Sequence, residues 1–516
     1  MDIRHNQVVI LDFGSQYTRL IARRIREQQV YTEILPSNSP VEIIKKHNPK
    51  ALILSGGPES VFSKKAPNYD EAIFDLDMPI LGICYGMQLL VQHYGGKIEK
   101  SKVHEYGFEN IDIIDQSSLL DNIPIKTNVW MSHSDFVAKI PENWEVVAKS
   151  SNNIIAAIEN KTLKRFATQF HPEVNHTAKG TEILSNFLFK VAKCDQNWTA
   201  ENFVNDKIES IRQQVPSSAT VLTAVSGGVD SSVVAAFLNK AIGKRARAVL
   251  IDHGLLRKNE AQNCRTSLKK NLGIAVEVVD ESEIFFRKLK GIRNPEKKRK
   301  IIGEQFIRSF ERFTANQHID YLAQGTLYTD VIESGGRGVS NTAKVIKSHH
   351  NVGGLPEDIK FELIEPLRDL FKDEVRNIGK LLGLPNSLLN RHPFPGPGLA
   401  VRVLGEVTKK RVKILQEADA IYIDILKNER IYDDIWQAFS VLIPVKTVGV
   451  MGDNRTYENV IALRAVTSLD GMTADWYRIP DKVLSKISNK IVNSVSGINR
   501  VVFDITSKPP GTIEWE

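Results

Sequence analysis

A single cysteine stands where the sequence predicts a sharp turn between a strand and a helix. Cys84 follows the apolar run PILGI and precedes a helical pattern that ends at Gly95 and Gly96. Gly82 and Gly86 lie two residues away on either side. A nucleophile at such a turn needs small neighbours, because its backbone is strained and a substrate must come close. A helix N-terminus also favours the thiolate. The spacing therefore indicates a nucleophile in preference to an inert, buried thiol.

A cysteine nucleophile needs a base, and the base needs a group that orients it. The segment RFATQFHPEV contains both, with His171 after a predicted strand and Glu173 two residues further on. Alone, a His-x-Glu pair most often lies in solvent. Here it follows a strand of the same predicted sheet as Cys84, and loops at the carboxyl ends of parallel strands converge on one edge. We therefore expect Cys84, His171 and Glu173 to meet.

A second segment has the pattern of a phosphate-binding loop. SGGVDSS opens a helical pattern after the strand candidate TVLTAV, so free backbone N–H groups and hydroxyls point at one spot. The Lys of the G-x-x-x-x-G-K-[ST] motif is absent, which excludes that type of loop. Asp230 would repel phosphate unless a cation lies between them, and this favours Mg²⁺ with Asp230 as a metal ligand. A simple capped helix start would need fewer of these residues. The predicted site comprises Ser226, Gly227, Gly228, Val229, Asp230, Ser231 and Ser232.

The elements that position these residues alternate between apolar runs and helical patterns. The strand candidates are VVILDF, ALILSG, PILGIC and RFATQF in the first segment and TVLTAV, RAVLID, AVEVVD and YLAQG in the second. This alternation predicts the α/β class, with two doubly wound, mainly parallel-sheet domains. The breaker-rich HPFPGPGLA stops a helix or a central strand. After it, helices near 408–429 and 481–495 and strands near 445–451, 458–466 and 500–505 predict a small α+β domain. The predicted domains are 1–195, 219–391 and 392–516, with a helical linker at 196–218.

The composition is ordinary for a globular protein, with 42% hydrophobic and 25% charged residues in 516. No apolar run approaches the roughly 20 residues of a membrane helix, and the first residues lack the pattern of a signal peptide. Three scattered cysteines fit neither a disulfide framework nor a zinc site. We therefore expect a cytoplasmic protein with no membrane partner. The densest basic stretch, 287–300, has no interleaved aromatic residues, which favours solvent or phosphate over nucleic acid as its partner.

The motifs GICYGMQ and QFHPE, in this order, resemble class I (triad) glutamine amidotransferases over about residues 6–195. The resemblance implies that Cys84 attacks the glutamine amide, forming a glutamyl thioester and releasing ammonia. His171 would act as the base and Glu173 would hold its ring. The resemblance also implies an oxyanion hole from the backbone N–H groups of Gly57 and Tyr85, and glutamine binding by Gln88, His133 and Ser134.

The loop SGGVDS is similar to that of the N-type ATP pyrophosphatases, which transfer adenylate from ATP to a substrate oxygen and release pyrophosphate. This implies ATP as a co-substrate, with Asp252, Gly325 and Thr326 near the adenosine. The segments QGTLYTDVIES, IKSHHNVGGLP, HPFPGPGLA and KPPGTIEWE resemble GMP synthases over the full length. The implied enzyme is a ligase with XMP, ATP and glutamine as small-molecule substrates and Mg²⁺ as a cofactor. Relatives imply a homodimer through the C-terminal domain.

Further site residues carry weaker patterns. Asp330 and Glu333 are three residues apart and would share a helix face, where they could hold Mg²⁺ or steer ammonia, or simply face solvent. The Gly-rich segment IKSHHNVGGLP is interpreted as a lid that brings Lys347, His349 and His350 to phosphates, although paired histidines in a loop are more often ordinary surface. The resemblance implies XMP binding by Arg299, Gln437, Arg500, Lys508, Ile513 and Glu514.

In this set, Arg and Lys suit the nucleotide phosphate, and Glu514 could accept hydrogen bonds from purine N–H groups. Two other classes stay open at this point. An RNA-modifying enzyme would need stacking aromatic residues in its basic surface. A glutamine-dependent NAD synthetase would need a nitrilase-like Glu-Lys-Cys site.

Overall fold

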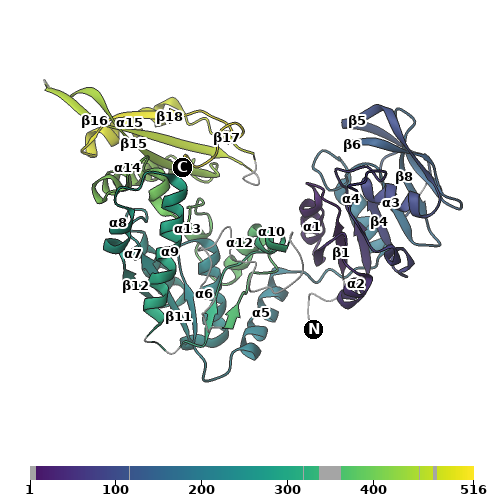
Figure 1. Cartoon of the computed structure of the whole chain (residues 1–516), viewed down its shortest axis with the longest axis horizontal. Helices are drawn as coiled ribbons and strands as arrows, with labels where there is room; N and C mark the ends of the chain where they lie inside the picture. The colour runs from purple at the N-terminus through teal and green to yellow at the C-terminus, as the bar shows by residue number, and fades with distance from the viewer. Residues whose placement is uncertain are drawn as a thin grey trace. The chain divides into compact units, whose positions relative to one another are not determined.

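The computed structural model describes residues 7–115, 117–315, 317, 319–335, 362–451, 454–468 and 473–516 (Figure 1). The chain forms two compact units, Met1–Asp206 and Lys207–Glu516, which we call unit 1 and unit 2. The helix α5 (Ala200–Gln214) carries the chain from one unit to the other. Three predicted lid residues, Lys347, His349 and His350, lie outside the described residues.

Unit 1 is built on a nine-stranded sheet in the order β2-β1-β3-β4-β9-β8-β7-β5-β6, counted over the described residues. The pairings from β2 to β9 are parallel, which confirms the predicted doubly wound half. The remaining pairings are antiparallel, an extension that the sequence analysis did not anticipate. The strands are β1 (Val8–Asp12), β2 (Thr32–Pro36), β3 (Ala51–Leu54), β4 (Ile80–Ile83), β5 (Lys97–Ile113), β6 (Lys126–Lys139), β7 (Glu145–Ser150), β8 (Ile155–Asn160) and β9 (Arg165–Thr168).

The central strands β3 and β4 are short and apolar. β3 and β4 are buried along their whole length, as expected for central strands with helices on both faces. The helices of unit 1 are α1 (Thr18–Glu27), α2 (Val41–His47), α3 (Tyr85–His93) and α4 (Gly180–Ser185), with a 3₁₀ turn at Glu71–Asp75 and a π-helical turn at Asn186–Val191.

Unit 2 begins with a five-stranded sheet in the order β12-β11-β10-β13-β14, again counted over the described residues. All its pairings are parallel, as predicted. The strands are β10 (Val221–Ala224), β11 (Ala246–Asp252), β12 (Val276–Asp280), β13 (Tyr321–Ala323) and β14 (Glu362–Ile364). The helices are α6 (Val229–Ile242), α7 (Glu260–Leu272), α8 (Ser282–Leu289), α9 (Pro295–Thr314), α10 (Tyr328–Gly335), α12 (Lys372–Leu381) and α13 (Asn386–Leu389), and a 3₁₀ turn covers Gly243–Arg245.

The last part of unit 2 is the small α+β segment that the sequence predicted. Its central strand β16 (Asn454–Thr467) pairs with β15 (Gln437–Met451) and β17 (Asp475–Trp476) in antiparallel fashion and with β18 (Ile498–Asp504) in parallel. The 3₁₀ turn η4 (Gly398–Arg402) and the helices α14 (Lys409–Asn428) and α15 (Asp481–Ser494) complete it. The hydroxyl of Thr408 accepts from the N–H of Arg411 and thereby caps α14.

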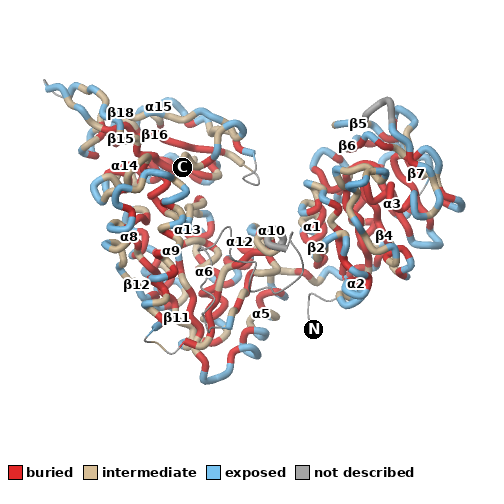
Figure 2. The backbone as a smooth tube through the Cα atoms, in the orientation of Figure 1, coloured by how far each residue is buried: buried red, intermediate tan, exposed pale blue. Residues whose placement is uncertain are grey.

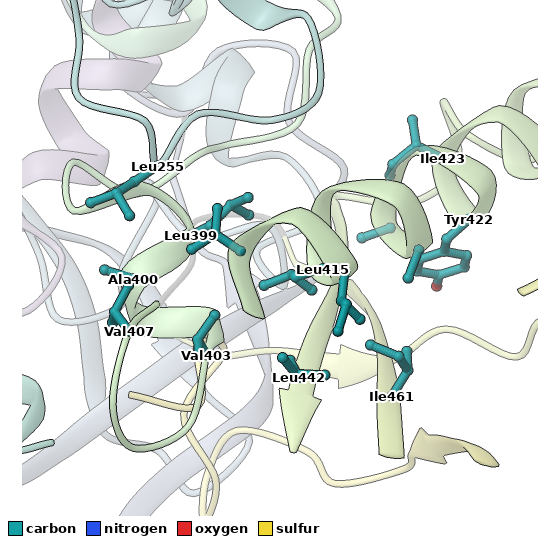
Figure 3. Packing of buried hydrophobic residues seen from close by; sticks show 14 of the residues in the cluster. Leu255, Leu399, Ala400, Val403, Val407, Leu415, Tyr422, Ile423, Leu442 and Ile461 are labelled. Carbon is teal, nitrogen blue, oxygen red and sulfur yellow. The ribbon is translucent and has the colours of Figure 1, made fainter. Parts of the chain in front are cut away.

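The two parts of unit 2 share one hydrophobic core. Leu222 and Val249 of the parallel sheet belong to the same buried cluster as Leu415 of α14 and Ile461 of β16. Figure 3 shows Leu399 on η4 packed between Leu255 and Leu415, and Figure 2 shows the buried segments running through both parts. The predicted boundary at residue 391 therefore remains a prediction. None of the described helices is long and apolar enough to cross a membrane.

Candidate active sites

Cys84 occupies a strained turn between β4 and α3. Its backbone has φ +51° and ψ −101°, a conformation that costs a non-glycine residue about 1–3 kcal/mol. The backbone N–H of Cys84 donates to the carbonyl of Thr168 on β9 at 2.7 Å, which ties the turn to the neighbouring strand. The thiol is only 5% exposed and forms no disulfide. The strain therefore falls on the predicted nucleophile itself.

The two flanking glycines leave room for this turn. A Cβ on Gly86 would lie 2.3 Å from the carbonyl oxygen of Leu54, and a Cβ on Gly82 would lie 2.5 Å from the carbonyl oxygen of Gly86. Both distances are shorter than any ordinary contact of a Cβ atom. The helix α3 thus packs against β3 and β4 at a distance that excludes side chains at these two positions.

His171 and Glu173 form a buried pair next to the thiol. Nδ1 of His171 lies 2.7 Å from Oε1 of Glu173, and both side chains are almost completely buried. Burial alone would lower the pKa of His171, but the Glu173 carboxylate and a hydrogen bond with the Cys84 thiol raise it well above its ordinary value. Tyr17 packs edge-on against the His171 ring, with the ring centroids 5.0 Å apart. The three residues of the predicted triad are therefore in contact.

The other residues predicted for the glutamine site lie on several elements of unit 1. A Cβ on Gly57 would lie 3.3 Å from Cγ of Tyr85, so the Gly57 backbone lies close to the Tyr85 side chain. Gln88 is buried, and its Nε2 donates to the carbonyl of Asp135 at 3.1 Å. His133 is buried on β6, with Nδ1 3.1 Å from that same carbonyl. Ser134, the next residue on β6, is exposed.

Three residues around Cys84 and His133 were not predicted from the sequence. The Cys84 thiol donates to the carbonyl of Ser132 at 3.7 Å, and Nε2 of Gln169 lies 3.6 Å from the same sulfur. Nε2 of His133 lies 3.2 Å from Oε2 of the buried Glu105 on β5. β5 and β6 belong to the unpredicted antiparallel extension, and the residues predicted on them were His133 and Ser134, which the family resemblance implied. Only Gln169 stands inside a motif that had been identified, QFHPE.

The predicted phosphate loop lies between β10 and α6. Gly227 has φ +76°, which favours glycine, and Gly228 is the N-cap of α6. The N–H of Ser226 donates to Oγ of Ser231 at 3.1 Å, and Oγ of Ser232 donates to the carbonyl of Gly228 at 2.7 Å. Nη1 of Arg391 donates to the carbonyl of Gly227 at 2.6 Å, a contact that the sequence did not reveal. The loop is thus held open at a helix N-terminus, where an anion binds favourably.

Asp230, inside this loop, has a carboxylate oxygen without a partner. Its Oδ1 atom is buried and has no hydrogen-bond partner among the described residues. Burial raises the pKa of Asp230, and nearby Asp330 adds to this effect while Lys372 and Arg376 oppose it. An unpartnered carboxylate oxygen suits a hard cation such as Mg²⁺. No cluster of three or more His, Cys, Asp or Glu exists in the described part of the chain, so other ligands would have to include phosphate or water.

The remaining predicted ATP residues follow the neighbouring strands. Gly325 comes after β13, and a Cβ there would lie 3.5 Å from Cβ of Asp230. The hydroxyl of Thr326 donates to Glu365 at 2.6 Å. Asp252 ends β11, and burial raises its pKa while a hydrogen bond from the N–H of Gly254 opposes the shift. Glu333 lies on α10 with Asp330, as predicted, although its side chain is outside the described atoms.

Some of the predicted XMP residues meet, and others lie apart. Nε2 of Gln437 donates to Oε1 of Glu514 at 2.8 Å. Ile513 is buried in the cluster beside β15. Arg500 is exposed on β18, where it donates to the carbonyl of Val448 at 3.5 Å. The backbone of Lys508 forms an isolated antiparallel β-bridge with Ala474. Nη2 of Arg299 donates to the carbonyl of Glu516.

Two buried cationic side chains that contact the C-terminal tail were not predicted from the sequence. Lys298 is completely buried within the basic stretch and binds Glu516. Arg402 is completely buried and binds Glu514. Composition suggested that the basic stretch faces solvent or phosphate, so a fully buried lysine was unexpected. Arg402 lies two residues beyond the motif HPFPGPGLA, which had been identified as a set of breakers and as part of the family resemblance.

Three parts of the chain match known protein families. Residues 9–191 match the family "Glutamine amidotransferase class-I", residues 200–327 match "NAD synthase", and residues 424–515 match "GMP synthase C terminal domain". The match of residues 9–191 gives the chain a class I amidotransferase half, whereas a glutamine-dependent NAD synthetase would need a nitrilase-type amidase half.

Similarity to curated proteins extends over the whole chain. Over 515 residues, covering 100% of both chains, the sequence is 53% identical to a protein of Aquifex aeolicus named "GMP synthase [glutamine-hydrolyzing]". Proteins of the same name from Thermosipho africanus and Chlorobium luteolum are each 54% identical, over 99% of this chain and 100% and 99% of theirs. The chain belongs to the family of glutamine-hydrolysing GMP synthases.

Proposed function

We propose that this protein is a ligase that aminates XMP to GMP, using ATP to activate the purine and glutamine as the nitrogen donor. ATP would be converted to AMP and pyrophosphate, and glutamine to glutamate. The observation that carries the proposal is the contact between Cys84, His171 and Glu173 at a strained turn, in a chain that also contains the phosphate loop. The first site supplies ammonia, and the second supplies the activated oxygen that ammonia displaces.

In the first half-reaction, the Cys84 sulfur attacks the side-chain carbonyl of glutamine. His171 takes the thiol proton and then gives it to the leaving nitrogen, which departs as ammonia. Glu173 accepts from Nδ1–H and stabilises the protonated ring, in agreement with the raised pKa of His171. The backbone N–H groups of Gly57 and Tyr85 would receive the negative charge on the carbonyl oxygen. Water then releases glutamate from the thioester.

In the second half-reaction, the C2 oxygen of XMP attacks the α-phosphorus of ATP and pyrophosphate leaves. Ammonia then attacks C2, and the adenylate leaves as AMP. The loop 226–232 would hold the pyrophosphate end, with Arg391 and Lys372 as nearby cations. Asp230 would hold Mg²⁺ through Oδ1, with Asp330 beside it. Bound magnesium would neutralise phosphate charge beside these carboxylates. Asp252, Gly325 and Thr326 would lie near the adenosine.

The acceptor would bind in the last part of unit 2. The contact between Gln437 and Glu514 supports this location for the purine base. Ile513 lies next to Glu514 in the sequence and is buried beside the same strand. Cationic side chains would bind the nucleotide phosphate, and the predicted ones are Arg299, Arg500 and Lys508.

We further propose a homodimer formed through the C-terminal sheet and a cytoplasmic location. Val448, Val450 and Tyr457 are 54%, 73% and 57% exposed, and Val448 pairs directly with Tyr457 across β15 and β16. Exposed apolar side chains on adjacent strands favour a protein partner, and a second copy of the chain is the simplest one. Light scattering should therefore give twice the chain mass of 58.0 kDa. The three free cysteines suit a reducing compartment.

Substrate-dependent release of AMP tests the proposed function. The protein would be incubated with ATP, Mg²⁺ and ammonia, together with either XMP or deamido-NAD. We expect AMP only with XMP. No AMP with XMP would refute the proposal, and AMP with deamido-NAD alone would make the protein an NAD synthetase.

A further inference from the structure

A completely buried arginine holds one of the residues proposed to read the purine base. Nε of Arg402 donates to Oε2 of Glu514 at 3.0 Å, and Nη2 donates to Oε1 at 2.7 Å. This is a bidentate contact, in which two N–H groups of the planar guanidinium donate to the two oxygens of one carboxylate. Arg402 is 0% exposed, whereas Glu514 is 19% exposed. The pair therefore has a buried cationic end and a carboxylate end that is open to a ligand.

The segment that ends in Arg402 is fixed from several sides. Gly398 has φ +64°, and a Cβ there would lie 2.4 Å from the carbonyl oxygen of Leu255. The N–H of Leu399 donates to the same carbonyl at 2.7 Å. Nζ of the buried Lys298 donates to the carbonyls of Ala400 and Val403 at 3.1 and 2.8 Å. Figure 3 shows Leu399, Ala400 and Val403 packed into the core. The backbone on both sides of Arg402 is thus immobilised.

The guanidinium itself is held between aromatic rings. Its central carbon lies 4.1 Å from the centroid of the Phe439 ring and 5.1 Å from that of Phe394. Its Nη1 atom is buried and has no hydrogen-bond partner in the part of the chain that the structure describes. Among the described residues, Glu514 is the one carboxylate that forms an ion pair with Arg402. The orientation of the guanidinium is therefore set by packing, and Glu514 adapts to it.

The hydrogen bonds leave one acceptor position on the carboxylate. A carboxylate has about four lone-pair positions. Arg402 occupies one on each oxygen of Glu514, and Nε2 of Gln437 occupies a second one on Oε1. The remaining position is on Oε2. A single N–H of a bound purine could fill it without displacing any existing hydrogen bond.

We propose that Arg402 is the positioning residue for recognition of the purine base. It orients the Glu514 carboxylate so that the open position on Oε2 accepts from a purine N–H. This inference rests on the proposed function, because it takes XMP as the ligand of this part of unit 2. The segment HPFPGPGLAVR would then serve to place the buried guanidinium of Arg402 next to Glu514 in the proposed acceptor site.

A merely structural role is the alternative, because loss of one partner from a buried ion pair is destabilising in itself. Arg464 provides a matched control. It is also completely buried, forms an ion pair with Asp504, and donates to the carbonyls of Thr506 and Thr512 in the same tail. Arg464 thus anchors the tail without touching the Glu514 side chain.

The test combines Arg402→Lys with Glu514→Gln in a double-mutant cycle, measured with ammonia as the nitrogen donor. A lysine keeps the positive charge but cannot make the two-pronged contact. We expect Arg402→Lys to raise KM for XMP about 10- to 100-fold, the range for one hydrogen bond to a charged group. KM for ATP and the rate of glutamine hydrolysis should change less than about twofold, within ordinary additivity error. The double variant should match Glu514→Gln alone, because Arg402 acts through Glu514.

Arg464→Lys should lower the melting temperature without a comparable rise in KM for XMP. The inference is overturned if KM for XMP is unchanged in Arg402→Lys, if KM for ATP rises equally, or if the two substitutions add independently. An equal rise in KM for XMP in Arg464→Lys would also overturn it. Failure of the proposed function is distinguishable, since the unmodified protein would then release no AMP with XMP.

Discussion

The substitution Gly86→Ala tests whether the geometry of the turn at Cys84 controls ammonia production. The new Cβ would lie 2.3 Å from the carbonyl oxygen of Leu54 and 2.7 Å from its Cβ, whereas real Cβ contacts essentially never fall below 3.0 Å. The helix α3 must therefore move away from β3 by about 0.7 Å. Overpacking of this kind costs about 1–3 kcal/mol, and a misplacement of about 1 Å at a reacting group costs about 100-fold in rate.

We expect the glutamine-dependent rate to fall roughly 10- to 100-fold. The rate of AMP release with ammonia should stay within about twofold of that of the unmodified protein, because the second site lies in unit 2. Glutamate release and AMP release would be measured on the same preparation. Gln92→Ala is the control, since Gln92 lies on the same helix α3 and is exposed. Retention of more than about a third of the glutaminase activity in Gly86→Ala would refute the reasoning.

Three further predictions concern charge. Glu173→Gln removes the carboxylate that raises the pKa of His171, so glutamate release should fall about 100-fold or more while the ammonia-dependent rate is unchanged. Asp230→Asn should reduce AMP release about 100-fold or more with either nitrogen donor, because the loop loses the buried carboxylate that we propose to hold Mg²⁺. Burial lowers the pKa of His253 to about 4, and its Nδ1 accepts from the N–H of Leu255. In the unfolded chain the pKa of His253 is near 6.5. Above that pH the preference of the folded state for the neutral ring contributes about 3 kcal/mol to the free energy of unfolding. This contribution is lost as the pH falls from 6.5 towards 4. Thermal unfolding from pH 7 to 4.5 should show the loss, with a shallower dependence in His253→Gln.

The parallel halves of the fold could be predicted because each strand carries its own signal. β1, β3, β4 and β9 are short apolar runs that end at Gly, Ser, Cys or polar residues, and each was found where it was expected. The antiparallel strands β5 and β6 were missed because their polar and apolar residues alternate on a half-exposed surface without a motif. As a result, Ser132 and Glu105 were absent from the predicted glutamine site.

The catalytic residues at strand ends could be predicted because the strands before them have clear sequence signals. The buried ion pairs have no such signal and could not be predicted. Cys84 and His171 each follow a strand of one sheet, so topology alone brings them together. Arg402 and Glu514 are 112 residues apart and meet through packing of η4 against the last sheet. Lys298 looked like part of a solvated basic run, because its burial depends on partners more than 100 residues away.

The glutamine-dependent and ammonia-dependent activities of Cys84→Ala test the central claim most directly. We propose that ammonia forms in unit 1 and that XMP is activated in unit 2. Removal of the nucleophile should therefore abolish GMP formation from glutamine. The same variant, assayed at high pH with an ammonium salt, should form GMP from XMP and ATP at a rate within about twofold of the unmodified protein. Loss of both activities, or retained glutamine-dependent synthesis, would contradict the account.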